Sequence, residues 1–377
     1  MLIRFLAGVC AACLLASCAT APAPQDLATP PPPTAIEPTA TPTPATVAEA
    51  WESARNPAEE LDSLATWTTE DGEVWLIASA KSTHRLVVYD GQTGKKLRTV
   101  GSKGSAPGQF NRPNGVAVYG DRLFVVERDN HRVQVLALPG FEPVGSFGSD
   151  ILRSPYGIWL RETEPDELEA YVTDSFMYGS RFDVVPPYAE LDQRVRRFRV
   201  QSDQRGSLRT HYTGSFGATD PSSALRMVES IAGDPANDRL MIADESRSDD
   251  SGHRGSTVRE YTLAGVATGR NIPEGSFAAE AEGVALWSCP DGGGYWVAVD
   301  QLAPLTVFHV FDRDTLAPRG SFQGKVTAFT DGVALDASAS NRFPGGALYA
   351  VDNDVAITAF DLRDVVAKLG LSPDCVQ

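Results

Sequence analysis

The chain has 377 residues, of which 33 are Lys or Arg and 49 are Asp or Glu, so its formal net charge is −16. A surplus of negative charge of this size argues against bare nucleic acid and anionic lipid surfaces as partners, because both are polyanions. It leaves open a polyanionic ligand that metal cations bridge to carboxylates. The sequence gives no indication of the oligomeric state.

The first 17 residues have the composition of a signal peptide, with Arg4 ahead of an apolar run that is too short to span a bilayer. The run ends in Leu15-Ala16-Ser17-Cys18, which resembles the bacterial lipobox, where the chain is cleaved before the cysteine and lipid is attached to its sulfur. We therefore expect residues 1–17 to be removed and Cys18 to be lipidated; an ordinary secretory signal cleaved elsewhere is the alternative. Ala19 in place of Asp is typical of outer-membrane sorting. The expected product is an exported lipoprotein, held at the outer membrane by its lipid alone and facing the periplasm or the cell surface.

Residues 18–50 form a segment rich in Pro, Thr and Ala with almost no large apolar side chain. Such a composition cannot bury enough surface to offset the chain entropy that folding removes. Its prolines favour an extended, semi-stiff chain. We predict a disordered linker here, followed by a single folded domain over residues 51–377.

The folded part contains two cysteines, Cys289 and Cys375, because Cys10 and Cys13 leave with the signal peptide. An oxidising compartment would allow the two to form a disulfide that ties the C-terminal tail to the last third of the domain, although their spacing does not decide this. The five histidines are scattered and the expected folded part contains no CxxC pair, so neither a zinc site nor a haem site is indicated.

A short pattern recurs along the domain: a polar residue, then Gly or Ser, then an apolar run. It is clearest in EAEGVALW (Glu280–Trp287) and TDGVALD (Thr330–Asp336). Recurrence at intervals of about 50 residues is the signature of a repeat protein. The small residue of the pattern occurs at Ser63, Gly115, Gly157, Ser230, Gly283 and Gly332.

Each occurrence begins the same series of strand signals: an apolar run, a turn cluster such as PDGGG, a second apolar run and a third alternating strand. No helical period separates these strands. Short, evenly spaced units of this kind predict an all-β fold, a six-bladed β-propeller with four-stranded antiparallel blades, in preference to a β-sandwich or a solenoid.

Hairpin geometry places the start of the first strand and the end of the second together, here at one mouth of the central channel. The polar residues predicted there are strongly acidic in the last three blades, and facing carboxylates require cations. Oxygen ligands from several blades suit Ca²⁺. Any one of these acids could instead cap backbone amides. The predicted channel residues are Asp62, Lys81, Asn114, Glu127, Arg128, Tyr156, Asp174, Glu229, Asp244, Glu245, Glu280, Glu282, Asp300, Asp331 and Asp352.

Successive segments of the domain resemble the blade motifs of the β-propeller phytases, calcium-dependent phosphatases of inositol hexakisphosphate. The resemblance covers most of residues 60–365, and its most specific parts are Glu280-x-Glu282-Gly283, Thr330-Asp331-Gly332 and the Phe-Pro-x-Gly run at Phe343–Gly346. A more local stretch, Gly104–Leu136, resembles an NHL repeat in its Gly-x-Phe-x-x-Pro-x-Gly and Asn-His-Arg-Val steps. Both families are six-bladed propellers.

The phytase resemblance implies a calcium-dependent phosphomonoesterase, in which a water molecule activated by the metal attacks phosphorus and no phosphoenzyme forms. Lys81, Arg128 and Tyr156 would hold the phosphate of a small phosphorylated substrate. The calcium ions, together with Lys81 and Arg128, would neutralise the charge that develops on the phosphoryl oxygens. Glu229 would belong both to this catalytic group and to the metal site. The calcium ligands implied by the resemblance are Asp62, Glu229, Glu245, Glu280, Glu282 and Asp331.

The sequence departs from the phytase pattern at several repeats. The first and fourth have Asp62-Ser63 and Glu229-Ser230, and the second has an NHL-like Asn114-Gly115. In the third repeat, Arg181 or Arg194 is a candidate replacement for a lysine of the family. These departures bear on the number of calcium ions and on phytate specificity more than on the location of the site.

Two other functions therefore stay open, a non-catalytic NHL-like binding propeller and a calcium-dependent sugar-lactone hydrolase. The positions of Lys81 and Arg128 distinguish them from a phosphatase. Cations that face the acidic group favour phosphate as ligand, whereas burial of both in ion pairs on the blade flanks opposes it. A channel that holds one metal ion and no phosphate-binding Lys or Arg would favour the sugar-lactone hydrolase.

Overall fold

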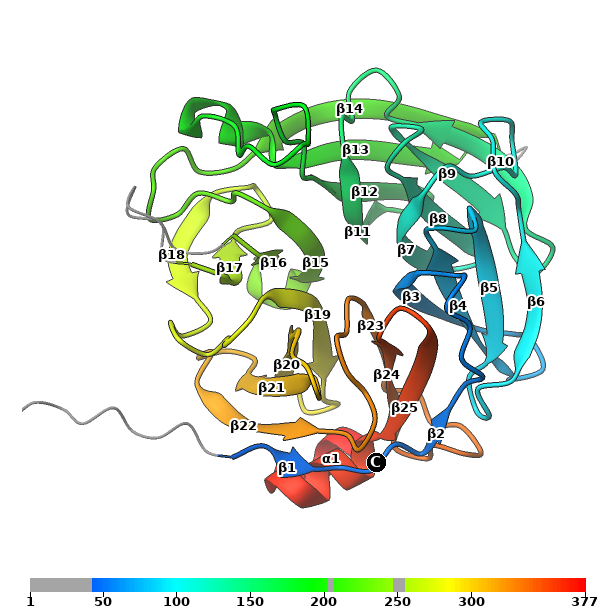
Figure 1. Cartoon of the computed structure of the whole chain (residues 1–377), viewed down its shortest axis with the longest axis vertical. Helices are drawn as coiled ribbons and strands as arrows, with labels where there is room; N and C mark the ends of the chain where they lie inside the picture. The colour runs from blue at the N-terminus through cyan, green and yellow to red at the C-terminus, as the bar shows by residue number, and fades with distance from the viewer. Residues whose placement is uncertain (1–42, 203–206, 247–254) are drawn as a thin grey trace, which may run out of the picture. The chain divides into compact units, whose positions relative to one another are not determined.

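The computed structural model describes residues 43–202, 207–246 and 255–377. Its strands form six antiparallel sheets of four strands, one of which gains an additional strand at its edge. The sheets are arranged radially around a central axis, as the blades of a propeller (Figure 1). The all-β, six-bladed propeller expected from the sequence is confirmed.

The first three blades each use four consecutive strands, paired in chain order from the axis to the outer edge. A short 3₁₀ helix, η1 (Tyr188–Gln193), lies in the connection within blade 3. The strands are β3 (Leu61–Thr68), β4 (Val74–Ala80), β5 (Arg85–Asp90) and β6 (Lys96–Val100) in blade 1; β7 (Pro113–Tyr119), β8 (Arg122–Glu127), β9 (Arg132–Ala137) and β10 (Glu142–Phe147) in blade 2; and β11 (Pro155–Glu164), β12 (Glu167–Asp174), β13 (Val195–Ser202) and β14 (Leu208–Phe216) in blade 3.

The last three blades follow the same order until blade 6, which has only three strands from its own part of the chain. The 3₁₀ helix η2 (Pro235–Asn237) lies in blade 4, and α1 (Leu362–Leu369) and η3 (Pro373–Val376) follow blade 6. The strands are β15 (Val228–Asp234), β16 (Arg239–Asp244), β17 (Thr257–Tyr261) and β18 (Ala267–Asn271) in blade 4; β19 (Ala281–Ser288), β20 (Gly294–Asp300), β21 (Val307–Asp312) and β22 (Pro318–Gln323) in blade 5; and β23 (Val333–Asp336), β24 (Ala347–Asp352) and β25 (Ala356–Asp361) in blade 6.

The N-terminal part of the domain supplies the outer strand that blade 6 lacks. Strand β2 (Trp51–Glu52) pairs antiparallel with β25, and β1 (Ala45–Thr46) pairs in parallel with β22 at the edge of blade 5. The propeller is thereby closed by pairing of its two chain ends. The folded unit therefore begins before residue 51, inside the segment expected to be linker. The sequence did not reveal this boundary, because a strand of two residues is too short to show an alternating pattern.

The hydrophobic core consists of six clusters, one at each interface between neighbouring blades. The second strand of a blade contributes to two of them, because each face of a blade contacts a different neighbour. In β4, Leu76 and Ala78 pack toward blade 6, whereas Ile77 packs toward blade 2. This two-sided burial explains the continuous apolar runs in the sequence.

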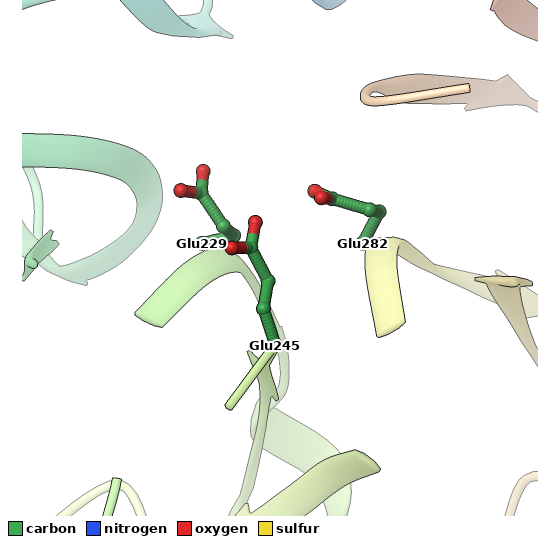
Figure 2. Close-up of side chains that lie close together, drawn as sticks. All are labelled: Glu229, Glu245 and Glu282. Carbon is green, nitrogen blue, oxygen red and sulfur yellow. The ribbon is translucent and has the colours of Figure 1, made fainter. Parts of the chain in front are cut away.

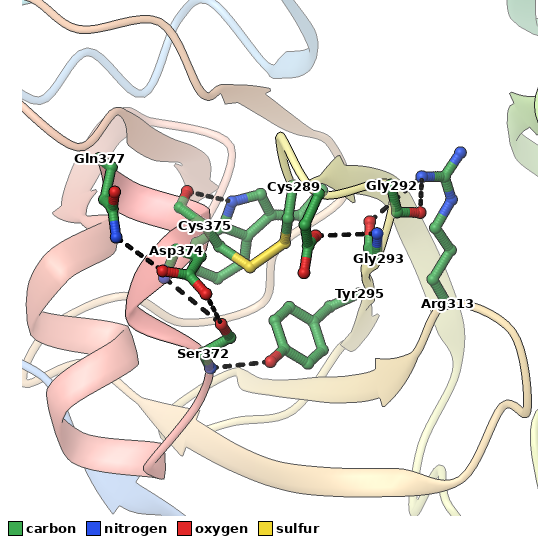
Figure 3. Close-up of a disulfide and its surroundings, with 11 residues drawn as sticks. Cys289, Gly292, Gly293, Tyr295, Arg313, Ser372, Asp374, Cys375 and Gln377 are labelled. Carbon is green, nitrogen blue, oxygen red and sulfur yellow. Dashed lines mark hydrogen bonds between the residues drawn. A yellow bond between two sulfur atoms is a disulfide. The ribbon is translucent and has the colours of Figure 1, made fainter.

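The structure confirms that Cys289 and Cys375, which are 86 positions apart in sequence, pair in a disulfide with their Cα atoms 4.4 Å apart (Figure 3). The bond joins η3 to the turn that follows β19 in blade 5. Trp287 also donates a hydrogen bond of 3.3 Å from its indole nitrogen to the Cys375 carbonyl. Blade 5 thus holds the C-terminal segment both covalently and by packing.

Residues 1–42, which include the expected signal peptide at 1–17, Cys18 and most of the expected linker, lie outside the described residues. Lipidation and export therefore stay predictions. Within the ranges that the structure describes, no helix has the length and apolar character needed to cross a membrane.

Candidate functional site

The recurrent polar residue and its following Gly or Ser form a β-bulge near the start of the inner strands. The pairing register with the second strand shifts there in five blades, for example between Leu61 and Leu64. A bulge leaves residues outside the ladder and redirects a side chain, in this case toward the channel. Six such residues, one per blade, line one cavity and are named the channel ring: Asp62, Asn114, Tyr156, Glu229, Glu282 and Asp331.

The small residue in the repeat allows neighbouring blades to approach closely at the channel. A Cβ atom on Gly332 would lie 2.3 Å from the Asp62 carbonyl oxygen, and one on Gly115 would lie 2.3 Å from that of Tyr156. Real Cβ atoms do not tolerate such contacts with backbone, so steric exclusion requires glycine there. The repeated pair of a polar residue and Gly or Ser therefore reflects two features: the close approach of neighbouring blades and the placement of polar side chains at the channel.

Three glutamates meet beside the channel: Glu229 in β15, Glu245 directly after β16 and Glu282 in β19 (Figure 2). One carboxylate oxygen of each lies within 4.8 Å of those of the others, and we name this group the glutamate cluster. Burial raises the pKa of Glu245 to about 7, and the charge of Glu280 adds to the shift. Burial and then the charge of Glu245 raise the pKa values of Glu229 and Glu282 well above their usual range.

The glutamate cluster fits a hard divalent cation such as Ca²⁺. Its donors are carboxylate oxygens from three separate segments, and Ca²⁺ accepts six to eight oxygen ligands in flexible geometry. A cation among them would also remove the repulsion that raises their pKa values. Three of the six predicted calcium ligands are thus brought within reach of one ion.

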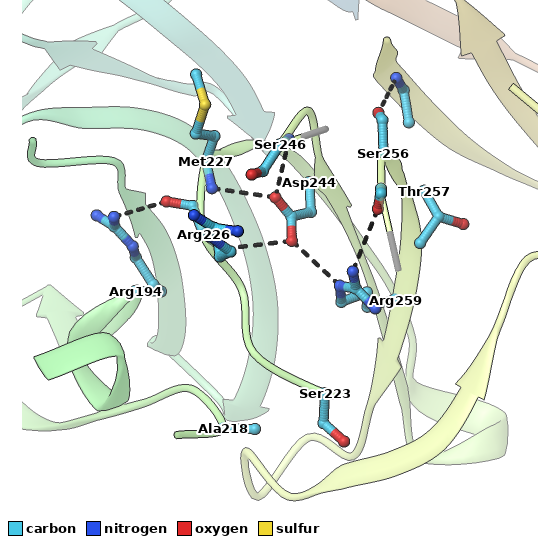
Figure 4. A network of polar contacts seen from close by, with 12 residues as sticks. Arg194, Ala218, Ser223, Arg226, Met227, Asp244, Ser246, Ser256, Thr257 and Arg259 are labelled. Atoms are coloured by element: carbon cyan, nitrogen blue, oxygen red, sulfur yellow. Dashed lines mark hydrogen bonds and ion pairs between the residues drawn. The ribbon is translucent and has the colours of Figure 1, made fainter. Parts of the chain in front are cut away.

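A buried carboxylate next to the cluster holds two of its members in place (Figure 4). Asp244 is fully buried and accepts hydrogen bonds from the backbone nitrogens of Arg226, at 3.2 Å, and Met227, at 3.0 Å. Its other contacts include the Arg259 guanidinium, at 3.1 Å. Since Arg226 and Met227 precede Glu229, and Asp244 precedes Glu245, one side chain orders the backbone beside both glutamates.

The expectation that the acids at the ends of the second strands face the channel is wrong. These side chains are at most 2 % exposed and accept hydrogen bonds from backbone amides of the loop that enters their own blade. Consecutive residues of a strand point to opposite sides. In blades 2, 4 and 5 the residue after the acid, which is Arg128, Glu245 or Gln301, contacts the channel residues instead. The five structural acids are Glu127, Asp174, Asp244, Asp300 and Asp352.

Lys81 faces the acidic part of the channel ring. Its Nζ lies 3.1 Å from Asp331 Oδ2 and 3.8 Å from Asp62 Oδ2. Burial by itself lowers the pKa of the ammonium, but the charges of Asp62 and Asp331 outweigh it and raise the pKa above its usual value. Lys81 therefore carries a positive charge into the part of the channel where Asp62 and Asp331 supply carboxylates.

Two acids that sequence reasoning missed lie beside Lys81. Glu60 lies 3.9 Å from its Nζ, and Asp354 belongs to the charges that raise its pKa. Burial, followed by the charge of Asp331, raises the pKa of Asp354 to about 7. Burial likewise raises the pKa of Asp62 to about 6. Neither Glu60 nor Asp354 occupies the recurrent position of the repeat, so no sequence signal marked them.

Arg128 and Tyr156 lie together at the side of the channel ring. The Arg128 guanidinium donates a hydrogen bond to the Tyr156 hydroxyl. Its Nε also lies 2.8 Å from Oδ1 of Asp129, which is exposed. Burial and then the charge of Glu229 raise the pKa of Tyr156 to about 12, so its hydroxyl remains a hydrogen-bond donor at neutral pH. Arg128 thus lies at the edge of the acidic group, in contact with one ring member.

Arg128 and Tyr156 also line a neighbouring cavity of about 610 Å³ that is richer in positive charge. Arg153 and Arg181 lie in its wall. The alternative candidate, Arg194, is fully buried and donates to the carbonyls of Phe176 and Arg226, so its role is structural. Of the two arginines considered for the third repeat, Arg181 is the one beside the site.

Glu280 is only partly buried and is not a member of the glutamate cluster, although its charge reaches Glu245. Its carbonyl accepts a hydrogen bond from the Gln301 nitrogen. The Gln301 side chain donates to Asp331 Oδ1, while Lys81 donates to Oδ2, so each carboxylate oxygen of Asp331 has a donor. Gln301 follows Asp300 as Glu245 follows Asp244, and alignment of the repeats is the signal that could have placed it.

Comparison with known proteins supports the propeller fold. The NHL repeat family matches residues 110–136, within the stretch that resembles an NHL repeat in sequence. A gluconolactonase from Xanthomonas campestris has a similar structure, with a TM-score of 0.51 and 15% identity over 81% of this chain and 87% of that one. No curated protein sequence matches the chain.

Two further solved structures are similar at lower scores. They are hydrazine synthase from Kuenenia stuttgartiensis, with a TM-score of 0.46 and 15% identity over 85% of this chain and 82% of that one, and virginiamycin B lyase from Staphylococcus aureus, with 0.43 and 8% over 81% and 97%. Identities this low carry no information about the reaction. Function is therefore argued from the residues of the channel.

Proposed function

We propose that this propeller is a calcium-dependent phosphomonoesterase that resembles the β-propeller phytases and hydrolyses inositol hexakisphosphate or a related phosphate ester. The observation that carries the proposal is the position of Lys81, whose ammonium lies among carboxylates at the channel mouth that also holds the glutamate cluster. A lone acidic site repels a phosphate ester. Carboxylates that hold cations, together with a lysine, create the mixed charge that phosphate recognition needs.

In this proposal, some residues of the channel bind the metal and others bind the phosphate group. Glu229, Glu245 and Glu282 would hold Ca²⁺, which in such a site lowers the pKa of water and offsets charge on phosphoryl oxygens. Lys81 donates toward the same space, and Asp331 keeps its ammonium charged. The phosphate group of the substrate is negatively charged. Both Ca²⁺ and the Lys81 ammonium therefore stabilise it more strongly as further charge develops on its oxygens during the reaction.

Arg128 and Tyr156 connect the reacting group to room for the rest of the substrate. Both line the channel side and the cavity of about 610 Å³, where Arg153 and Arg181 add positive charge. A volume of this size accommodates a ligand larger than one phosphate. Positive charge around it suits an ester that carries further phosphates.

The proposal is tested by phosphate release from inositol hexakisphosphate by the purified protein, first with calcium and then with a chelator. We expect release that requires calcium. Glu282→Gln and Asp331→Asn should each lower it at least about 100-fold while the fold is retained, because each removes a charged group that metal or Lys81 contacts. Glu164→Gln, which changes an exposed acid of β11, is the matched control and should leave release unaltered.

Calcium binding and lactone hydrolysis, measured beside phosphate release, separate the alternatives. Calcium binding without release of phosphate from any ester would favour a binding propeller. Calcium-dependent opening of a sugar lactone, without phosphate release, would favour the lactone hydrolase. The placement of Lys81 beside Asp331 supports the phosphatase over both, because an ammonium group among the channel carboxylates is a donor that phosphate recognition uses.

A further inference from the structure

A phenylalanine in the wall of the cavity beside the channel is largely exposed to solvent. Phe182 lies in the segment between β12 and η1, is 76 % exposed and lines the cavity of about 610 Å³, which we name the large cavity. Its backbone has a φ of 55°, in the left-handed region that bulky residues rarely adopt. Packing within the described chain therefore does not explain why an aromatic ring is held at this place.

The same wall brings an arginine against an aromatic ring. The guanidinium carbon of Arg153 lies 3.8 Å from the centre of the Phe176 ring, and Arg153 is itself exposed. Both residues line the large cavity together with Phe182. Guanidinium groups and aromatic rings are the side chains on which flat aromatic ligands stack. The wall thus combines two groups that recognise a planar π-system.

The large cavity is continuous with the place assigned to phosphate. Tyr156 lines both the channel cavity and the large cavity, so a ligand with its phosphate beside this residue can extend its other atoms toward Phe182. A volume of about 610 Å³ suits a small organic ligand. In inositol hexakisphosphate every ring carbon carries a phosphate, so that molecule has no flat apolar face to place against this wall.

We propose that the phosphate ester preferred by this chain carries a planar aromatic group, as a nucleotide does, and that Phe182 recognises that group. The phosphate occupies the channel, and the aromatic group lies against Phe182 and the Arg153 guanidinium in the large cavity. Phe182 is then exposed because its partner is the ligand. The inference rests on the proposed function for the reacting phosphate, and it extends that function to the class of alcohol that the ester contains.

Binding of adenosine 5′-monophosphate and of ribose 5-phosphate to the purified full chain, measured by calorimetry with calcium present, tests the inference. The two esters share a sugar and a phosphate and differ in the base. The nucleotide should bind about tenfold more tightly, which is the size of one stacking contact. Equal affinity for the two esters would overturn the proposal.

Substitution of the exposed ring identifies the residue responsible. Phe182→Ala and Phe182→Leu should both lose the preference for the nucleotide and keep their affinity for ribose 5-phosphate, because neither side chain has a π-face. Phe182→Tyr should retain the preference. Leu97→Ala, at another exposed apolar residue, is the matched control and should retain it too. An undiminished preference in Phe182→Ala would refute the assignment.

Phosphate release from the same two esters and from inositol hexakisphosphate separates this inference from the proposed function. Release of phosphate together with equal binding of the two esters would refute the aromatic site and leave the phosphatase intact. Preferential binding of the nucleotide that depends on Phe182, with no phosphate released from any of the three, would support the aromatic site and contradict the phosphatase.

Discussion

The Lys81 ammonium lies 3.1 Å from Asp331 Oδ2, so the first and last blades are joined by a hydrogen bond between residues 250 apart in sequence. The same nitrogen is within 3.9 Å of Glu60. Lys81 is therefore the counter-ion of a carboxylate group as well as the cation that we assign to substrate phosphate. Loss of the Lys81 charge should therefore weaken catalysis but strengthen the binding of calcium.

Replacement of Lys81 should separate substrate binding from metal binding. Lys81→Met should lower kcat for phosphate release about 100-fold or more, because a charged donor to the phosphoryl group is removed. It should also raise calcium affinity, because a positive charge beside Asp331 and Asp62 no longer competes with the ion. Kinetics and calcium titration measure the two effects. Lys81→Arg retains the charge and is the control; weaker calcium binding in Lys81→Met would show that the lysine only maintains the fold.

The glutamate cluster should make the metal-free protein less stable as pH rises. Burial raises the pKa of Glu245 from 4.5 to about 7, so between these values the folded state binds more protons than the unfolded state. The free energy of unfolding in chelator therefore decreases from about pH 5 to pH 8, by at least about 1 kcal/mol. Urea unfolding at several pH values measures this slope. Calcium should reverse it, since the ion binds the ionised carboxylates; a flat profile in chelator would contradict the raised pKa.

Close contact between blades predicts a cost for a single methyl group at Gly332. Its Cβ would lie 2.3 Å from the Asp62 carbonyl oxygen, which is backbone and cannot move aside. Gly332→Ala should lower the free energy of unfolding by about 1–3 kcal/mol, as overpacking does elsewhere. Gly145→Ala is the matched control, because its nearest neighbour is a flexible Leu208 side-chain atom at 3.2 Å. Equal effects of both substitutions in chemical denaturation would argue against the steric explanation.

The disulfide should stabilise the fold without taking part in the reaction. Replacing Cys289 and Cys375 by Ser together should lower the free energy of unfolding by about 2–4 kcal/mol, because the bond closes a loop of 86 residues. Phosphate release should be retained at temperatures where the variant is folded, since neither cysteine lines the channel cavity. Denaturation and activity measured on the same sample test both statements, and loss of activity in a folded variant would refute the second.

The sequence could predict the blades because each one repeats the same local signals. Two-sided burial produces apolar runs such as Leu76–Ala80, and the bulge leaves a polar residue before Gly or Ser. Glu282 and Asp331 were recognisable for that reason, without knowledge of the contacts that either residue makes. Their repeated position reflects a local backbone feature, which neighbouring residues in the chain are sufficient to specify.

The direction of the strand-end acids could not be predicted in the same way. Asp244 and Glu245 are adjacent and both acidic, yet Asp244 caps backbone amides while Glu245 joins the glutamate cluster. Composition does not distinguish them, because the choice depends on which side of the strand faces the channel. A shift of one residue in register would exchange their roles.

The sequence by itself determined the number of blades and the ring of polar residues, because these depend on local patterns repeated along the chain. Only the tertiary structure decided that β2 closes the last blade, that Cys289 and Cys375 pair, and that Asp354 and Glu60 lie beside Lys81. Those relations depend on which distant segments come together when the ring of blades closes. No local pattern encodes such distances, so the charge balance of the channel becomes visible only in the folded chain.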